Sequence, residues 1–152
     1  MRASGKWLAG LALLSLSLLG YADSTVDTAT NDGRFGQQIM TGEALSKNAD
    51  RSGMLLLYCL DSSWYRLGAM FPEMSKQEKS ERLIEVCQSY IDTYSVYNVL
   101  LAADYYGEPK SEQQAWQIIQ DNRQRGDNQG EQEVHEMIRK YAQTLDDTPP
   151  NK

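Results

Sequence analysis

The chain has 152 residues and a formal net charge of −6, with 21 acidic and 15 basic side chains. This length is sufficient for one domain with a sizeable hydrophobic core. The acidic excess argues against nucleic acid and anionic lipid surfaces as partners, because both need a basic footprint, and it suits either a basic protein partner or simple solubility.

The first 22 residues have the three parts of a secretory signal peptide. Arg2 and Lys6 form a basic head, an apolar run over 7–19 follows, and small residues precede a cut after Ala22. The apolar run of about 13 residues is shorter than the ~20 that span a bilayer, which disfavours a retained anchor. No cysteine lies near the cut, so a lipoprotein is not expected either. We therefore expect export to the periplasm without stable membrane insertion.

Cleavage after Ala22 would remove Arg2 and Lys6, so that 21 acidic and 13 basic residues remain and the net charge becomes −8. In an exported protein the two cysteines, Cys59 and Cys87, are expected to form a disulfide. Closing a loop of this size would stabilise the fold by about 3–4 kcal/mol in the chain-entropy model. A metal site or a catalytic thiol is disfavoured because the chain has a single histidine, and no cofactor is expected.

Polar segments flank the predicted folded part of the chain. Residues 23–37 are expected to form a flexible leader, and residues 146–152 a disordered tail, because Ser, Thr, Asp, Asn, Gly and Pro predominate there. A single helical domain is expected over 38–145. Its first two helices are predicted at 38–48 and 52–69, the second being rich in Leu and Met and free of β-branched residues, which favours a helix over a strand.

The strongest helical pattern lies between Ser75 and Tyr106. Ser75 and Glu78 have the spacing of a capping box, no Pro or Gly interrupts the segment, and Gly107 is a natural end. Apolar residues recur at steps of four and three, which marks one helical face. This face holds Leu83, Cys87, Tyr90, Tyr94, Tyr97 and Leu101. We expect one long central helix here, or two helices with a break near Asn98.

Two more helices are predicted at 111–125 and 128–145. Ser111 and Gln114 repeat the capping-box spacing, and Gly126 separates the two helices. No segment alternates polar and apolar residues for long enough to indicate a strand. The sequence thus predicts an all-α fold, a compact bundle of four to five helices with one long central helix, stapled by one disulfide.

Three clusters of functional side chains each have a structural explanation. The tyrosine face (Tyr90, Tyr94 and Tyr97) either packs in the core or lines an open groove for sugars or peptides. Alternating charge around Glu78, Glu81 and Glu85 is typical of the solvated side of a helix. Glu131 and His135 lie one turn apart and could hold a metal or act as a general acid/base pair, but two ligands do not make a metal site and a solvated helix face is expected instead. Sequence motifs of serine hydrolases, zinc proteases and phosphate-binding loops are absent, so no enzymatic activity is expected.

Two segments are better candidates for recognition of a partner. Trp64, Tyr65 and Arg66 combine the three residue types that are enriched at interface hot spots. Tyr105 and Tyr106 place two aromatic side chains beside acidic groups at the end of the predicted long helix. The alternative for both segments is that the aromatic residues fold back over the core.

The segments around the two cysteines resemble the Tai/Rap1a-type periplasmic immunity proteins of type VI secretion systems. In that family a leucine-rich helix ends in a cysteine, and a second helix carries a Cys-x-x-Tyr-Ile-like motif. Here these elements read Leu55-Leu56-Leu57-Tyr58-Cys59 and Cys87-Gln88-Ser89-Tyr90-Ile91. The later segment 113–119 is similar to the penultimate helix of the family, so the resemblance covers about residues 40–145.

The resemblance implies a non-enzymatic inhibitor, commonly a homodimer, which binds a peptidoglycan-cleaving effector in the periplasm and covers its active site. An acidic surface would steer a basic effector toward it. The contact is expected at Trp64, Tyr65 and Arg66 or at Tyr105 and Tyr106. Two other functions stay open: a small periplasmic helical chaperone or envelope-complex subunit, and a cell-wall or carbohydrate hydrolase.

Overall fold

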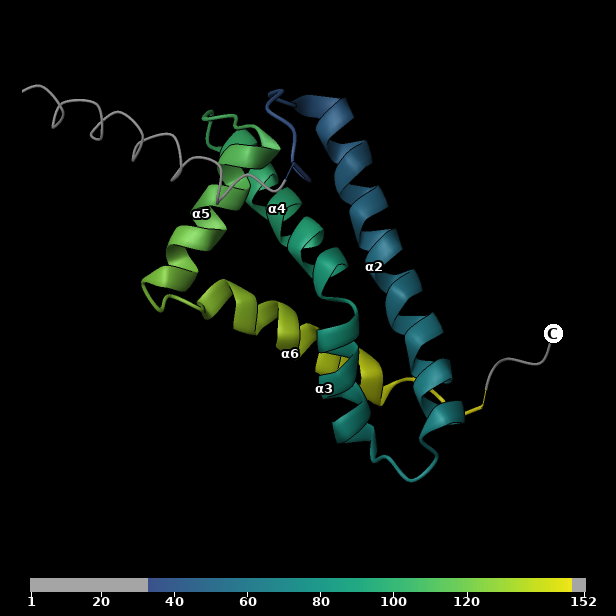
Figure 1. Ribbon diagram of the computed structural model, residues 1–152. Helices are drawn as coiled ribbons and strands as arrows, with labels where there is room; N and C mark the ends of the chain where they lie inside the picture. Colours follow the sequence, from purple (N-terminus) through teal and green to yellow (C-terminus); the bar gives the residue numbers. More distant parts are fainter. Residues whose placement is uncertain (1–32, 149–152) are drawn as a thin grey trace, which may run out of the picture. The chain divides into compact units, whose positions relative to one another are not determined.

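The computed structural model describes residues 33–148, which fall into two units divided after Phe35 (Figure 1). In the described part of the first unit, residues 33–35, the guanidinium carbon of Arg34 lies 5.2 Å from the centroid of the Phe35 ring. The predicted signal peptide, residues 1–22, lies outside the described residues, as do most of the predicted leader and residues 149–152.

The described residues of the second unit form five α-helices and no strand, which confirms the predicted all-α fold. An isolated antiparallel bridge joins Ile39 to Ser111. Within residues 33–148, no helix combines the length and the hydropathy that crossing a bilayer requires. The helices are α2 (Gly42–Met70), α3 (Lys76–Val86), α4 (Gln88–Tyr105), α5 (Glu112–Gln124) and α6 (Gln129–Gln143).

Helices α2 and α4 pack against each other in antiparallel fashion (Figure 1). At one end the backbone N–H of Gly42 donates to the Asp104 carboxylate at 3.2 Å. Further along, Cys59 of α2 is bonded to Cys87, next to the start of α4. Since residue numbers rise along α2 as they fall along α4, the end of α4 lies beside the start of α2.

A single helix, α2, replaces the two that were predicted at 38–48 and 52–69. It is continuous over 29 residues. Gly53, where intrinsic propensity favours a break, lies against α4: a Cβ placed on Gly53 would be 3.8 Å from the ring of Tyr94. Packing between the two helices therefore overrides the local preference.

The predicted long central helix is in fact two helices, α3 and α4, and the break falls at Cys87 rather than near Asn98. Cys87 leaves helical geometry, with φ −96° and ψ 14°. No Pro or Gly causes this kink. It allows α3 to pack against α6 while α4 packs against α2 and α5, so that tertiary contacts fix its position.

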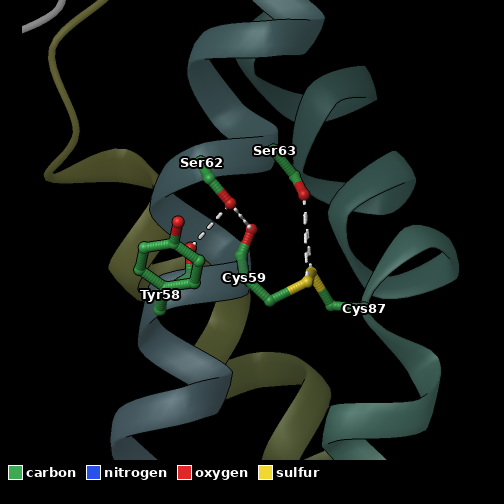
Figure 2. Close-up of a disulfide and its surroundings, with 5 residues drawn as sticks. All are labelled: Tyr58, Cys59, Ser62, Ser63 and Cys87. Atoms are coloured by element: carbon green, nitrogen blue, oxygen red, sulfur yellow. Dashed lines mark hydrogen bonds between the residues drawn. A yellow bond between two sulfur atoms is a disulfide. The ribbon is translucent and has the colours of Figure 1, made fainter.

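The predicted Cys59–Cys87 disulfide is present and joins α2 to the kink (Figure 2). The two Cα atoms are 6.0 Å apart. The hydroxyl oxygen of Ser63 lies 3.8 Å from each sulfur atom, and Ser62 donates to the carbonyl of Tyr58 at 2.8 Å. The core surrounds this bond and draws side chains from α2, α3, α4 and α6. Its most deeply buried members include Leu56, Leu60, Trp64, Leu83, Ile91 and Ile138.

The first residues of the predicted disordered tail are packed on the fold, so the prediction was wrong for positions 146 and 147. The indole N–H of Trp64 donates to the carbonyl of Asp146 at 3.0 Å. The ammonium group of Lys79 lies 2.7 Å from the Asp147 carboxylate. Lys76 donates to the carbonyl of Leu145 at 3.0 Å. These contacts fix residues 145–147 beside α2 and α3.

Candidate protein-interaction site

The first recognition segment predicted from the sequence does not form a surface centred on Trp64. This residue is only 1% exposed, and the segment lies inside α2 rather than in a loop. Helical spacing places Trp64 on the same face as Leu60 and Leu67, which are also buried. Tyr65 packs partly against the core, and only Arg66 is exposed. Trp64 as a partner contact was therefore a wrong prediction.

The second recognition segment is a surface feature rather than a lid folded back over the core. Tyr105 is 84% exposed and Tyr106 is 78% exposed. Their rings pack edge to face, with centroids 5.1 Å apart and an interplanar angle of 86°. We call this pair the aromatic tip. Two adjacent, exposed tyrosines offer a large contact area at low cost in side-chain entropy.

A tight C-terminal cap holds the aromatic tip in place. The N–H of Gly107 donates to the carbonyl of Asp104 at 3.1 Å, and the N–H of Glu108 donates to that of Ala103 at 2.9 Å. This pair of bonds is a Schellman motif, which needs a left-handed residue after the helix. Gly107 supplies it with φ 75°. Gly107 and Glu108, which follow directly in the chain, thus order the backbone that carries both tyrosines.

Neighbouring elements brace the base of the aromatic tip. The Asp104 carboxylate accepts from the N–H of Gly42 at the start of α2. The Glu112 carboxylate, at the start of α5, accepts from the Tyr97 hydroxyl and from the N–H of Gly36 at 2.9 Å. Burial and the hydrogen bond to Glu112 both raise the pKa of Tyr97, which keeps its phenol neutral. The start of α2 is thus joined to the end of α4, and the start of α5 is joined to Tyr97, about two turns earlier in α4.

The predicted tyrosine face is divided between core and surface. Tyr97 is buried, Tyr94 is half-buried and Tyr90 is exposed. The hydroxyl of Tyr94 lies 4.0 Å from the sulfur of Met137 in α6. Tyr94 also lines an open groove of about 570 Å³ between α4, α5 and α6. The face is thus neither wholly core nor wholly groove.

Arg123, which lines that groove, is paired with two carboxylates. Arg123 donates to Asp92 at 3.0 Å and to both oxygens of Glu131, at 3.1 and 3.2 Å. Burial disfavours the charge of Arg123, but the carboxylates of Glu131 and Asp92 outweigh it and raise the pKa of Arg123. His135 Nε2 lies 3.9 Å from Glu131, beyond hydrogen-bond distance. Because Arg123 occupies both Glu131 oxygens, Glu131 is placed for an ion pair rather than for catalysis with His135.

No group of three or more His, Cys, Asp and Glu side chains within residues 33–148 is arranged to hold a metal ion. Glu78 accepts from the N–H of Ser75 at 2.8 Å, as the capping-box spacing predicted. Glu81 receives two hydrogen bonds from Arg139, the shorter at 2.7 Å. These glutamates thus cap a helix and join α3 to α6.

An exposed apolar surface on α2 was not predicted from the sequence. Four large apolar side chains of its central part point outward. The signal was present in the unbroken run of seven apolar residues from Met54 to Leu60. Successive helical residues are about 100° apart, so a run of this length covers every side of the helix and cannot be wholly buried on one face. The exposed members, which we call the α2 outer face, are Met54, Leu55, Leu57 and Tyr58.

Comparison with known proteins finds no family model, no curated protein and no solved structure that matches this chain.

Proposed function

We propose that this chain is an exported, non-enzymatic protein-binding inhibitor: an immunity protein of the Tai/Rap1a type that covers the active site of a peptidoglycan-cleaving effector. The observation that carries the proposal is the aromatic tip, in which Tyr105 and Tyr106 stand in solvent on a capped helix end. Exposed tyrosines with no role in the core are the side chains expected at the centre of a binding interface.

Rigidity of the scaffold supports tight binding. The Schellman cap after Tyr105 and the Asp104–Gly42 bond order the tip before any partner arrives. A preorganised surface loses little conformational entropy on binding, so more of the contact energy appears as affinity. Acidic side chains at Asp104 and Glu108 flank the rings and would favour encounter with a basic effector.

The sequence resemblance supports the same proposal. Its two motifs, 55–59 and 87–91, contain the two cysteines that the disulfide joins. The motif residues Leu56 and Ile91 lie in one hydrophobic cluster with both cysteines. The motif pair would thus maintain the body of the inhibitor, while residues outside both motifs contact the effector.

The test is inhibition of an exported cell-wall hydrolase encoded beside this protein, measured as release of dye from labelled peptidoglycan. The oxidised protein should inhibit at a stoichiometry of one inhibitor chain to one hydrolase chain. The double variant Tyr105→Ala/Tyr106→Ala should bind at least about 100-fold more weakly, since two hot-spot residues are lost. The matched control is Tyr58→Ala, which removes an equally exposed tyrosine from α2.

Two outcomes would count against different parts of this proposal. Failure of the unaltered protein to bind or inhibit the hydrolase would contradict the function. Inhibition that survives in the double variant but is lost in Tyr58→Ala would contradict the site and move it to α2.

The α2 outer face favours a second candidate, a periplasmic chaperone or envelope-complex subunit. Contiguous exposed apolar side chains commonly mark sites of protein contact. A chaperone would slow the aggregation of several unrelated unfolded proteins, and Met54→Ser/Leu57→Ser would abolish this effect. An immunity protein would leave such aggregation unchanged and act on one effector.

A further inference from the structure

A second surface with its own chemistry lies where α2 turns into α3. Its apolar floor is formed by four residues of the turn, Met70, Phe71, Pro72 and Met74. Met70 is 62% exposed and Phe71 is 47% exposed. The hollow has a volume of about 730 Å³ and is open to solvent. We call it the turn notch.

Backbone hydrogen bonds order the turn that carries the apolar floor. The N–H of Phe71 donates to the carbonyl of Leu67 at 2.8 Å, and the N–H of Met74 donates to that of Phe71 at 3.0 Å. Methionine side chains are flexible and polarizable, so they adapt to incoming apolar groups of varied shape. A half-exposed aromatic ring beside two methionines is suited to receive a large aliphatic or aromatic side chain.

Carboxylates form the rim of the turn notch. Glu73, Glu78, Glu81 and Glu85 line it, together with one cation, Arg82. Arg82 pairs with Glu85 along α3, and Arg139 of α6 pairs with Glu81. Glu73 and Glu78 therefore supply the uncompensated charge of the rim. The backbone hydrogen bond from Ser75 lowers the pKa of Glu78, which keeps this rim carboxylate ionised at neutral pH.

The lysines of α3 do not neutralise this rim, because their ammonium groups bind the C-terminal segment instead. Lys76 donates to the carbonyl of Leu145, and Lys79 pairs with Asp147 while its ammonium lies 4.1 Å from the centre of the Trp64 ring. Lys79 is also buried. The rim of the turn notch is therefore left with an acidic excess, which Glu73 and Glu78 carry because Glu81 and Glu85 are paired with arginines.

We propose that the turn notch binds a basic amphipathic segment of a partner protein, with one large apolar side chain on the floor of Met70, Phe71 and Met74 and flanking Lys or Arg residues on the acidic rim. An apolar floor selects an apolar anchor, and carboxylates around it select cations over anions. The aromatic tip and the turn notch lie at opposite ends of α2, since Gly42 bonds to Asp104 while Met70 ends the helix. At 1.5 Å per residue they are roughly 40 Å apart, so this proposal stands without the proposed inhibitor function.

A synthetic probe tests the proposal directly. A fluorescein-labelled 14-residue amphipathic peptide of Leu and Lys would be titrated with the protein expressed from its full sequence, with the disulfide intact, and followed by fluorescence anisotropy. The matched peptide carries Glu in place of every Lys. We expect the Lys peptide to bind at least about tenfold more tightly than the Glu peptide and to lose affinity as salt rises, because exposed charges are screened.

Variants locate the binding. Met70→Ala/Phe71→Ala should weaken binding of the Lys peptide at least about tenfold by removing the floor. Glu73→Gln/Glu85→Gln should reduce both the affinity and its dependence on salt. The control Met54→Ala/Tyr58→Ala removes two exposed apolar side chains elsewhere on α2 and should leave affinity unchanged. Circular dichroism would check that every variant keeps the helical fold.

Several results would overturn the proposal. They are equal binding of the two peptides, no saturable binding of the Lys peptide up to millimolar protein, or equal loss of affinity in the control variant. A dimer in sedimentation that Met70→Ala/Phe71→Ala dissociates would also overturn it, because a second copy would then cover the notch. None of these outcomes depends on inhibition of a hydrolase, so the two proposals fail separately.

Discussion

Lys79 and Trp64 illustrate how single residues close this fold. The Lys79 ammonium lies between the face of the Trp64 ring, at 4.1 Å from its centroid, and the Asp147 carboxylate, at 2.7 Å. A cation over an indole ring is attracted more strongly when it is shielded from water. The same indole donates its N–H to the carbonyl of Asp146. One aromatic side chain thus fixes both a buried lysine and the C-terminal segment.

Replacing Trp64 should therefore destabilise the protein. Trp64→Phe removes the indole donor, leaves the Asp146 carbonyl without this bond and opens a small cavity, so we expect a loss of about 2–3 kcal/mol in the free energy of unfolding. Urea denaturation followed by circular dichroism measures it. Tyr58→Phe, on the exposed side of the same helix, is the control and should change little. Equal stability of the two variants would show that the Trp64 contacts contribute nothing.

The Tyr141 phenol makes the free energy of unfolding decrease as the pH rises into the alkaline range. Its hydroxyl donates to the Asp61 carboxylate at 2.5 Å, and this bond, with burial, raises the pKa of Tyr141 from 10.0 to about 12. A raised pKa means that the folded state favours the neutral phenol. The resulting stabilisation is complete below pH 10.0, the unfolded value, and is lost as the pH rises toward about 12.

Tyr141→Phe should flatten this alkaline decline. The variant loses the Asp61 bond and is expected to be less stable than the unaltered protein at pH 8, with a smaller difference at pH 11.5. Thermal melts at the two pH values measure the change. Tyr97 will contribute its own decline, because its pKa is also raised, so Tyr97→Phe serves as the comparison. An unchanged difference between pH 8 and pH 11.5 would contradict the role assigned to Tyr141.

At the scale of helices, two glycines differ in whether their backbone conformation tolerates a side chain. Gly107 has φ 75° and a Cβ there would meet nothing within 4 Å. Gly107→Ala should therefore cost about 1 kcal/mol through the left-handed backbone alone. Gly130, inside α6, also has open space around a Cβ but no positive φ. Gly130→Ala should stabilise by about 0.5–1 kcal/mol. Urea denaturation of both variants measures the contrast, and equal signs would contradict it.

Local sequence signals and tertiary contacts determined different parts of the helices. Both capping boxes, at Ser75 and Ser111, and the glycine ends at Gly107 and Gly126 could be predicted, because each needs only residues a few positions apart. The break at Cys87 could not, because it depends on α3 and α4 packing against different neighbours.

Local sequence signals and tertiary contacts also determined different parts of the candidate site. The helix end that carries the aromatic tip was predictable from Gly107, whereas the exposure of its two rings was one of two alternatives that the sequence left open. The spacing of Trp64 from Leu60 and Leu67 within the predicted helix 52–69 already indicated a buried face. The cover that residues near 146 place over the indole could not be foreseen, because it depends on a contact 82 residues away in sequence. The turn notch also depends on the path of α3 relative to the C-terminal segment.

For the molecule as a whole, the disulfide is the largest single covalent constraint on the unfolded chain. It joins positions 28 residues apart in sequence. Cys59→Ala/Cys87→Ala should lower the free energy of unfolding by about 3–4 kcal/mol in the chain-entropy model, without loss of helical content at low temperature. Urea denaturation with and without reductant measures it. The double variant should be insensitive to reductant, and an unaltered protein equally stable after reduction would contradict the expectation.

The bond from Trp64 to Asp146 also has a consequence for synthesis. Its two partners are 82 residues apart. Whether the chain emerges from a ribosome or from an export channel, the second partner follows long after the first, so Trp64 stays uncovered while the segment from α3 to α6 appears. The core around Trp64 is completed only when the segment after α6 has emerged. A stop codon or a fused domain placed just before position 146 would leave a helical but unfinished molecule, a natural target for quality-control proteases.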